Sequence, residues 1–144
     1  MKSIPVILDT NCLVSALIFA RGRMTWLRIA WQSGQIIPIV CKETVDELLR
    51  VFAYPKFHLE RNEIDIMLAE FLPWTKVVVI DEEVDNIEKL RDKDDAVFIR
   101  LSQQTGAAYL VSGDRHILEL KELFFELNIV SPSEFHEEII TYLQ

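Results

Sequence analysis

Short, unbroken runs of branched apolar residues alternate along this chain with stretches of helical periodicity. The first run is Ile4–Leu8, and it stops at a carboxylate, Asp9. A strand that is apolar at every position is typical of a parallel sheet that is buried on both faces. Further strands are predicted at Pro38–Cys41, Val77–Ile80, Ala107–Val111 and Asn128–Val130. In the predicted strand Pro38–Cys41, the proline is expected at the start, because proline cannot donate to a strand ladder.

Helices are predicted between the strands, where apolar residues recur every three or four positions. Leu13–Phe19 and Met24–Trp31 are expected to be helical, with a break around Arg21-Gly22. The other expected helices are Glu43–Phe52, Glu60–Leu72, Asp94–Gln104, a short one near Ile117–Leu120, and one that Pro132 opens with Ser131 as its cap. The alternation predicts a single three-layer α/β/α domain with a central parallel sheet over residues 1–144.

Two aspartates follow strands of the predicted sheet. Asp9 comes directly after the first strand, and Asp114 comes two residues after the fourth predicted strand. A third acid, Asp95, is expected in the first turn of the helix that begins at Asp94, leaning toward its apolar side. Parallel sheets bind ligands beyond the carboxyl ends of their strands. Each aspartate has an alternative role as a helix cap or turn residue, but their common location favours a site.

Several carboxylates in one crevice need a compensating positive charge. Two like charges about 4 Å apart repel by roughly 4 kcal/mol at an effective dielectric of 20, and no lysine or arginine lies close to Asp9 in the sequence. Carboxylates with polar neighbours such as Thr10, Asn11 and Ser112 suit Mg²⁺ or Mn²⁺. Such an ion would support attack of water on a phosphodiester. Direct attack by an aspartate on phosphorus is the alternative.

The net charge of −8 argues at first against a nucleic-acid partner. Residues 1–58, however, hold seven basic and four acidic side chains, so the remainder carries −11. The two cysteines, Cys12 and Cys41, cannot build a disulfide framework, and no apolar run approaches the roughly 20 residues of a membrane span. With no N-terminal leader, the sequence predicts a cytoplasmic protein.

Four segments together carry a family resemblance: LDTNCLVSAL, DELLRVFAYPKF, DKDDAVFIRLSQQTGAAYLVSGDRHIL and IVSPSEF. In this order and spacing the chain resembles the PIN-domain ribonucleases, in particular the bacterial and archaeal branch that includes toxins of toxin–antitoxin pairs. The resemblance implies an endoribonuclease that depends on Mg²⁺ or Mn²⁺, with RNA as its substrate. It also implies a small antitoxin that blocks the site, and relatives commonly form homodimers.

The resemblance assigns roles to individual residues. The catalytic acids would be Asp9, Glu47, Asp95 and Asp114, with Asp92 as a supporting metal ligand and Thr10, Asn11 and Ser112 orienting water and metal. Helical periodicity alone places Glu47 away from the apolar stripe of Val45, Leu48, Leu49 and Phe52. A surface position is therefore the alternative for Glu47, with Glu43 and Asp46 as competing candidates.

Two positions depart from the family pattern. His116 stands where many relatives have an acid, and Lys93 stands where they often have a proline. The first departure leaves the number of metal ions open, and His116 is expected to approach the phosphate instead. The N-terminal basic cluster of Arg21, Arg23 and Arg28 is expected to hold the RNA backbone.

Other classes of function fit less well or remain open. An aspartyl phosphotransferase commonly has a second aspartate two places after the nucleophile, where this chain has Asn11. A receiver-type signalling domain has its acidic pair after the first strand, whereas here Asp94-Asp95 lies two thirds along the chain. A PIN-like module that binds RNA or protein without catalysis stays open because of His116.

Overall fold

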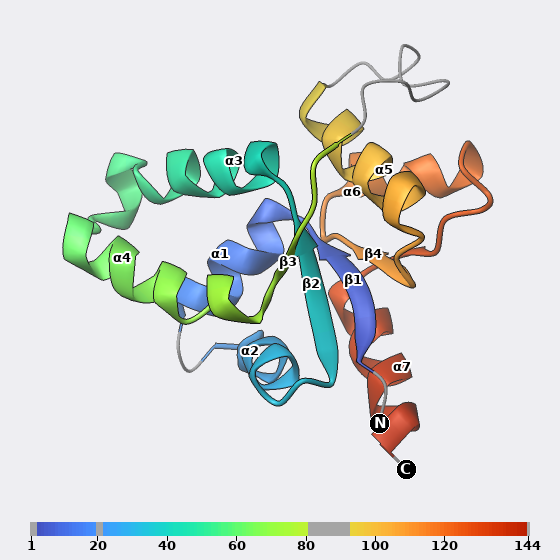
Figure 1. The fold of residues 1–144 in the computed structure, drawn as a ribbon, viewed down its shortest axis with the longest axis horizontal. Helices are drawn as coiled ribbons and strands as arrows, with labels where there is room; N and C mark the ends of the chain where they lie inside the picture. Colours follow the sequence, from blue (N-terminus) through green and yellow to red (C-terminus); the bar gives the residue numbers. More distant parts are fainter. Residues whose placement is uncertain (1–2, 20–21, 81–92, 144) are drawn as a thin grey trace.

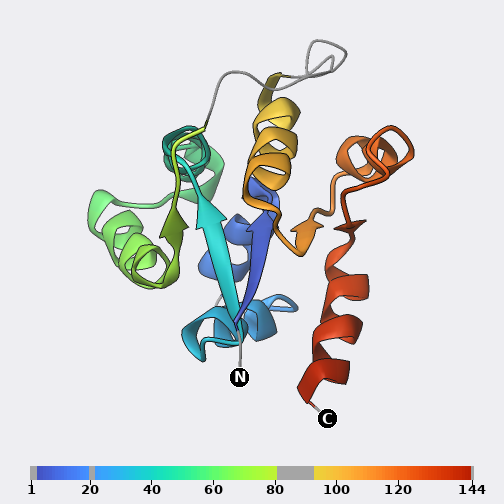
Figure 2. The same cartoon turned by 45° about the vertical axis from the view of Figure 1, so that its right-hand side comes forward.

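The computed structural model describes residues 3–19, 22–80 and 93–143. Its centre is a five-stranded sheet in the order β3-β2-β1-β4-β5, in which every pair of neighbouring strands is parallel (Figures 1 and 2). The strands are β1 (Ile4–Leu8), β2 (Ile36–Val40), β3 (Lys76–Val77), β4 (Tyr109–Val111) and β5 (Ile129–Val130). The parallel α/β sheet predicted from the apolar runs is confirmed.

Seven α-helices lie in the part of the chain that the structure describes, and each lies in a region where a helix is predicted. They are α1 (Thr10–Ile18), α2 (Thr25–Gln32), α3 (Lys42–Phe52), α4 (Arg61–Ala69), α5 (Lys93–Thr105), α6 (Arg115–Glu119) and α7 (Pro132–Leu143). Short 3₁₀ turns follow α3, α4 and α6, at η1 (Pro55–Phe57), η2 (Leu72–Trp74) and η4 (Leu120–Glu122). The α5 helix is followed directly by Gly106, whose φ of +65° is one that glycine adopts without a steric penalty.

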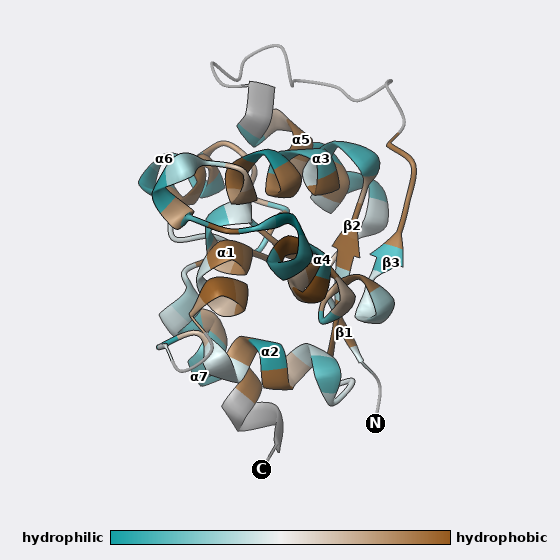
Figure 3. Ribbon diagram, turned by 90° about the vertical axis from the view of Figure 1, so that its left-hand side faces the viewer, coloured by the Kyte–Doolittle hydropathy of each residue, from teal (hydrophilic) through white to brown (hydrophobic). Residues whose placement is uncertain are grey.

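The alternation of side chains along the strands produces three layers. In β1, Val6 and Leu8 face one layer of helices and Ile7 faces the other. The first layer contains α1, α2, α3, α4 and α7, and the second contains α5, α6 and η4. Figure 3 shows β1 and β2 hydrophobic for most of their length, while the helices around them have mixed faces. The predicted α/β/α architecture is confirmed, and none of the described helices is both long and apolar enough to cross a membrane.

The position of Pro38 differs from its prediction, because β2 begins two residues earlier, at Ile36. In a parallel ladder, alternate residues bond to opposite neighbours. Ile4 N–H donates to Gln35 O on the β1 side, and Val78 N–H donates to Val40 O on the β3 side. The nitrogen of Pro38 therefore faces β3, whose pairing starts only at Ile39. A proline is tolerated inside the strand because no partner strand needs its missing N–H.

The predicted strand at Val77–Ile80 is shorter than expected. β3 covers only Lys76–Val77 and lies at the edge of the sheet, with one further bond from Val78 N–H to Val40 O at 2.9 Å. Val77 and Val79 are 70% and 87% exposed. An apolar run shows that a segment favours a strand, but an edge strand has a neighbour on one side only, so pairing ends where that neighbour ends.

The start of α7 contains the cap predicted at Ser131. Ser131 Oγ accepts a hydrogen bond from Glu134 N–H at 3.2 Å, and Glu134 Oε1 accepts one from Ser131 N–H at 3.0 Å. This reciprocal pair is a capping box. The hydrogen bond from the Ser131 amide lowers the pKa of Glu134 below its ordinary value.

Replacing this carboxylate should have a pH-dependent effect on stability. Because the pKa of Glu134 is lowered by folding, its stabilisation is present above the unfolded value of about 4.3 and is lost as pH falls through the folded value. Glu134→Gln should lower the free energy of unfolding by about 0.5 kcal/mol at pH 6 and by less at pH 3, as measured by urea denaturation. Glu138→Gln, at an exposed position later in α7, is the control. An equal cost at both pH values would contradict the assignment.

Candidate functional site

Asp9 lies at the carboxyl end of β1, the middle strand of the sheet, and begins α1. Its backbone N–H donates to Val111 O on β4 at 3.0 Å, which joins the two strand ends. Its Oδ1 accepts a hydrogen bond from Cys12 N–H at 2.8 Å, so the side chain caps α1. Only 3% of Asp9 is exposed. Asp9 thus has the capping role proposed as an alternative, and the cap holds its carboxylate at the edge where parallel sheets bind ligands.

Ser112 links Asp9 to Asp114. The buried Ser112 hydroxyl donates to Asp9 Oδ2 at 2.5 Å, and its oxygen accepts from Asp114 N–H at 2.9 Å. Asp114, which is half-buried, accepts from His116 N–H at 2.8 Å and caps α6. These bonds span 103 residues of sequence and bring together the ends of β1 and β4. The structure therefore places three of the predicted site residues in one hydrogen-bonded chain.

A second polar pair connects α1 with α3. The buried Thr10 hydroxyl donates to Glu47 Oε2 at 2.9 Å, and Glu47 is half-buried. Helical periodicity had favoured a surface position for Glu47, and the packing of α3 against α1 explains the difference, because the flank of the apolar stripe faces α1. The competing candidates, Glu43 and Asp46, are both exposed. Asp46 forms an ion pair with Lys42 at 2.8 Å.

The third predicted acid lies at the start of α5. Asp95 is half-buried in the first turn, while Phe98 and Ile99 further along are buried in the second layer. The described part of the helix begins at Lys93, one residue before the predicted start at Asp94. Helix ends are set by local hydrogen bonds that shift by a residue or two from the pattern. Asp92 falls outside the described residues.

The chemistry of these side chains suits a hard divalent cation. Ion pairs join Arg28 to Glu70, Lys42 to Asp46 and Arg115 to Glu119, and Asp9 takes part in none of these three. Its buried charge receives hydrogen bonds only from neutral donors, and the oxygen-rich neighbourhood is one that Mg²⁺ and Mn²⁺ accept. No three ligating side chains within residues 3–19, 22–80 and 93–143 already converge on one point. The carboxylates and their oxygen-bearing neighbours are nevertheless the kind of ligand that such an ion binds.

The buried Cys12 thiol lies next to Asp9. Burial raises the pKa of Cys12 well above its ordinary value, and the charge of Asp9 raises this pKa further. The thiol is therefore protonated at neutral pH.

The predicted RNA-binding residues are not all near the acids. Arg28 is mostly buried in an ion pair with Glu70 and lines a cavity with Leu17 and Ile18, at the end of α1 opposite Asp9. The expectation that Arg28 holds RNA is not supported by this position. Arg23 and His116 are exposed, and His116 is adjacent to the Asp114 cap. Arg21 falls outside the described residues.

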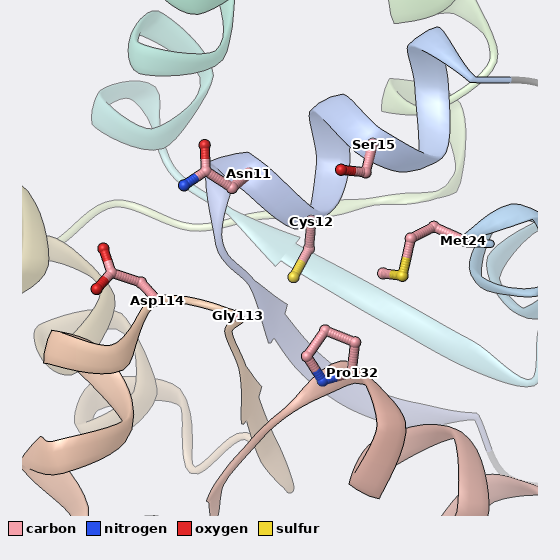
Figure 4. A pocket seen from close by; sticks show the side chains of 7 residues that line it. All are labelled: Asn11, Cys12, Ser15, Met24, Gly113, Asp114 and Pro132. Atoms are coloured by element: carbon pink, nitrogen blue, oxygen red, sulfur yellow. The ribbon is translucent and has the colours of Figure 1, made fainter. Parts of the chain in front are cut away.

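A cavity of about 230 Å³ adjoins the acids and was missed from the sequence. Figure 4 shows Asn11 and Asp114 at one end, Ser15 and Met24 at the other, and the Cys12 sulfur and the Pro132 ring between them. The i, i+3 spacing of Cys12 and Ser15 indicates one face of α1. No sequence signal placed Met24 or Pro132 there, because they lie at the starts of α2 and α7, which only the fold brings to this edge.

Two solved structures illustrate the similarity of the fold to known proteins. One is PAE2754 from Pyrobaculum aerophilum, with a TM-score of 0.64 and 12% identity over 96% of this chain and 90% of that one. Another is VapBC2 from Rickettsia felis, bound to a DNA fragment from their promoter, with a TM-score of 0.59 and 15% identity over 89% of this chain and 98% of that one. At these identities the likeness concerns the fold.

Sequence comparison gives the family. The chain is 24% identical to MJ1680 of Methanocaldococcus jannaschii, an uncharacterized protein, in an alignment 156 positions long that covers 97% of this chain and 94% of the relative. The model of the PIN domain matches residues 5–116, which include β1 with Asp9, α3 with Glu47, α5 with Asp95 and the β4–α6 turn with Asp114. Since this match spans most of the chain and contains every acid of the site, the chain belongs to the PIN domain family.

Proposed function

We propose that this protein is an endoribonuclease that uses Mg²⁺ or Mn²⁺ to cleave RNA phosphodiesters, and that it is the toxin of a toxin–antitoxin pair. PIN domains are generally metal-dependent nucleases. The observation that carries the proposal is the buried Asp9 carboxylate at the end of the middle strand, bonded only to neutral donors and linked through Ser112 to Asp114. A buried charge with this surrounding is costly unless a cation joins it.

Each residue of the site has a proposed role in cleavage. Asp9, Asp95 and Asp114, with Asp92, would hold the ion, which when bound lowers the pKa of a water and neutralises phosphate charge. Ser112 sets the separation of Asp9 from Asp114 through its two hydrogen bonds. The Thr10 hydroxyl donates to Glu47 Oε2, and this carboxylate would orient water and accept its proton.

The phosphate backbone needs positive side chains at the rim of this acidic crevice. Arg23 is exposed immediately before Met24, which lines the cavity beside Asp114, and His116 and Arg115 are exposed in the first turn of α6. We assign RNA binding to Arg23 and His116, together with Arg21. Because the chain carries −8 overall, this attraction depends on local charge and should weaken steeply with salt.

A cleavage assay tests the proposed activity. Purified protein is incubated with single- and double-stranded RNA in Mn²⁺, in Mg²⁺ and in EDTA, and products are separated on a denaturing gel. Cleavage inside the strands is expected with either metal and not with EDTA. Cleavage in EDTA would contradict the metal role, and no cleavage under any condition would favour the non-catalytic PIN-like module.

The toxin role has its own test in cells. Induced expression of the wild-type chain in a bacterial host should arrest growth, and Asp9→Asn expressed to the same level should not. Co-expression of the small protein encoded next to this one should restore growth and co-purify with the chain, as expected for an antitoxin. Normal growth with active, soluble protein would contradict a toxin role while leaving the nuclease proposal in place.

The Thr10 hydroxyl should matter through Glu47. Thr10→Val keeps the shape of the buried side chain but removes the donor to Glu47 Oε2. We expect kcat to fall by about tenfold or more, the usual cost of losing a hydrogen bond that orients a site residue. Thr10→Ser retains the hydroxyl and should keep most of the activity. Equal loss in both variants would indicate a packing role for Thr10 instead.

A further inference from the structure

A cavity beside Asp114 adjoins the acidic site and is lined by residues from several elements. It is about 230 Å³ in volume and shares Asn11 and Asp114 with the acidic site, while its far end is formed by Ser15 and Met24 (Figure 4). Resting on the proposed ribonuclease function, we propose that this cavity binds one unstacked nucleobase of single-stranded RNA, from a nucleotide that flanks the cleaved phosphate. The acids and the base pocket would then contact adjacent parts of one nucleotide step.

The walls of the cavity suit the faces of a base. Cys12, Met24 and Pro132 present a thiol, a thioether and a proline ring, and Figure 4 shows all three directed toward the same space. Sulfur atoms are polarizable and make favourable contacts with aromatic rings, and a methionine adapts its shape to the ring it meets. These walls carry no formal charge, so the cavity favours an uncharged ring over a second phosphate.

The ends of the cavity suit the edge of a base. Ser15 is half-buried on α1 and presents a hydroxyl, and Asn11 is exposed at the start of the same helix and presents an amide. Each of these groups can both donate and accept hydrogen bonds. They can therefore satisfy the polar edge of a purine or of a pyrimidine, and the site would recognise a base without requiring one identity.

The size and location of the cavity select a single-stranded substrate. Pockets that enclose drug-sized ligands measure roughly 300–1,000 Å³, so 230 Å³ holds one ring system and not two stacked bases. At the turn that lines the cavity, a Cβ added to Gly113 would meet no atom within 4 Å, so there is open space next to Asp114. A base inside a duplex is stacked and paired, and must leave the helix to enter such a pocket.

The test combines changes in the protein with changes in the RNA. Ser15→Leu fills the cavity, and Met24→Ala removes its thioether wall as a second variant in case the first folds poorly. Ser33→Leu is the matched control. Ser33 is exposed and precedes the start of β2, whereas the cavity adjoins the site at the carboxyl ends of the strands. Each protein cleaves a short single-stranded RNA and a series in which one nucleotide at a time is abasic.

In the wild type, one abasic position next to the cleaved bond should lower kcat/KM by about tenfold or more. Ser15→Leu or Met24→Ala should lower cleavage of the intact RNA and leave cleavage of that abasic RNA nearly unchanged, so that the tenfold difference shrinks to about twofold. Ser33→Leu should retain the full difference. If the cavity variants lower cleavage of both RNAs by the same factor, or if no abasic position matters, the base pocket is refuted.

A binding experiment distinguishes an error in the base-pocket proposal from an error in the ribonuclease proposal. With the Asp9→Asn chain in EDTA, fluorescence anisotropy compares a labelled single strand with a fully abasic strand of equal length and with a duplex. The single strand should bind about tenfold more tightly than the other two, and adding Ser15→Leu should remove this preference. Binding of this kind without cleavage in the wild type would overturn the ribonuclease proposal alone. Cleavage without the preference would overturn the base pocket alone.

Discussion

Asp9→Asn should lower metal-dependent RNA cleavage by about a thousandfold while the protein keeps its fold. Asparagine has almost the same shape as aspartate, and its oxygen can still accept the hydrogen bond from Cys12 N–H that caps α1. Its amide can donate to the Ser112 oxygen in place of the present bond. The change therefore removes the negative charge at the end of the middle strand and little else.

Metal-linked stability gives a second measurement on the same variant. A divalent ion at 100 times its dissociation constant should stabilise the wild type by about 2.7 kcal/mol, and Asp9→Asn much less. Asp65→Asn, at an exposed position on α4, removes one acid elsewhere and should behave as the wild type in cleavage and melting. If Asp9→Asn cleaves RNA as fast as the Asp65→Asn control, Asp9 is a helix cap and not part of a metal site.

Trp31→Ala should lower the free energy of unfolding by about 3–5 kcal/mol. Trp31 has no exposed surface, and its ring meets the edge of Phe71 with centroids 5.1 Å apart. Its Nε1–H also donates to Glu70 O at 3.1 Å, a bond that joins α2 to the end of α4. The substitution leaves a cavity and removes a donor at once. Domains of this size are stable by only about 5–15 kcal/mol in total, so the variant should be close to unfolding.

Urea denaturation followed by circular dichroism measures this loss. Trp31→Phe keeps the ring packing and should cost less than the alanine variant. Trp74→Ala is the matched control, because Trp74 lies in η2 with 38% of its surface exposed and should cost about 1 kcal/mol. A Trp31→Ala variant that is as stable as Trp74→Ala would show that the core relaxes into the space.

The strands and helices were predictable because each depends on a local pattern. Ile4–Leu8 and the helical stretch before Phe52 have the same limits in the structure within a residue. The predictions that differ from the structure concern segments whose conformation depends on a neighbouring strand. Pro38 is accepted inside β2 because β3 begins one residue later, and the run from Val77 forms only a short edge strand because pairing with β2 ends there. Neither fact is a property of the segment itself.

Some residues of the candidate site could be placed from a local pattern, and others could not. Asp9 and Asp114 follow strands, and a parallel sheet sends all its strand ends to one edge, so their proximity was predictable. Glu47 was recognised only through the family resemblance, because a helical wheel gives angles about one axis and says nothing of the helix packed alongside. The position of Arg28 could not be read from the sequence either, because its ion pair with Glu70 and its place in a cavity with Leu17 and Ile18 depend on how α2 and α4 pack.

The sequence by itself determined the layered parallel α/β fold and the strand-end positions of Asp9 and Asp114, because these follow from the spacing of apolar residues along one segment. Only the tertiary structure decided that Thr10 bonds to Glu47, that Ser112 bonds to Asp9, and that residues of α1, Met24 and Pro132 line a cavity beside Asp114. These contacts join residues 37 and 103 positions apart in the two hydrogen bonds. They depend on how side chains from different elements pack together, which periodicity within any one element does not contain.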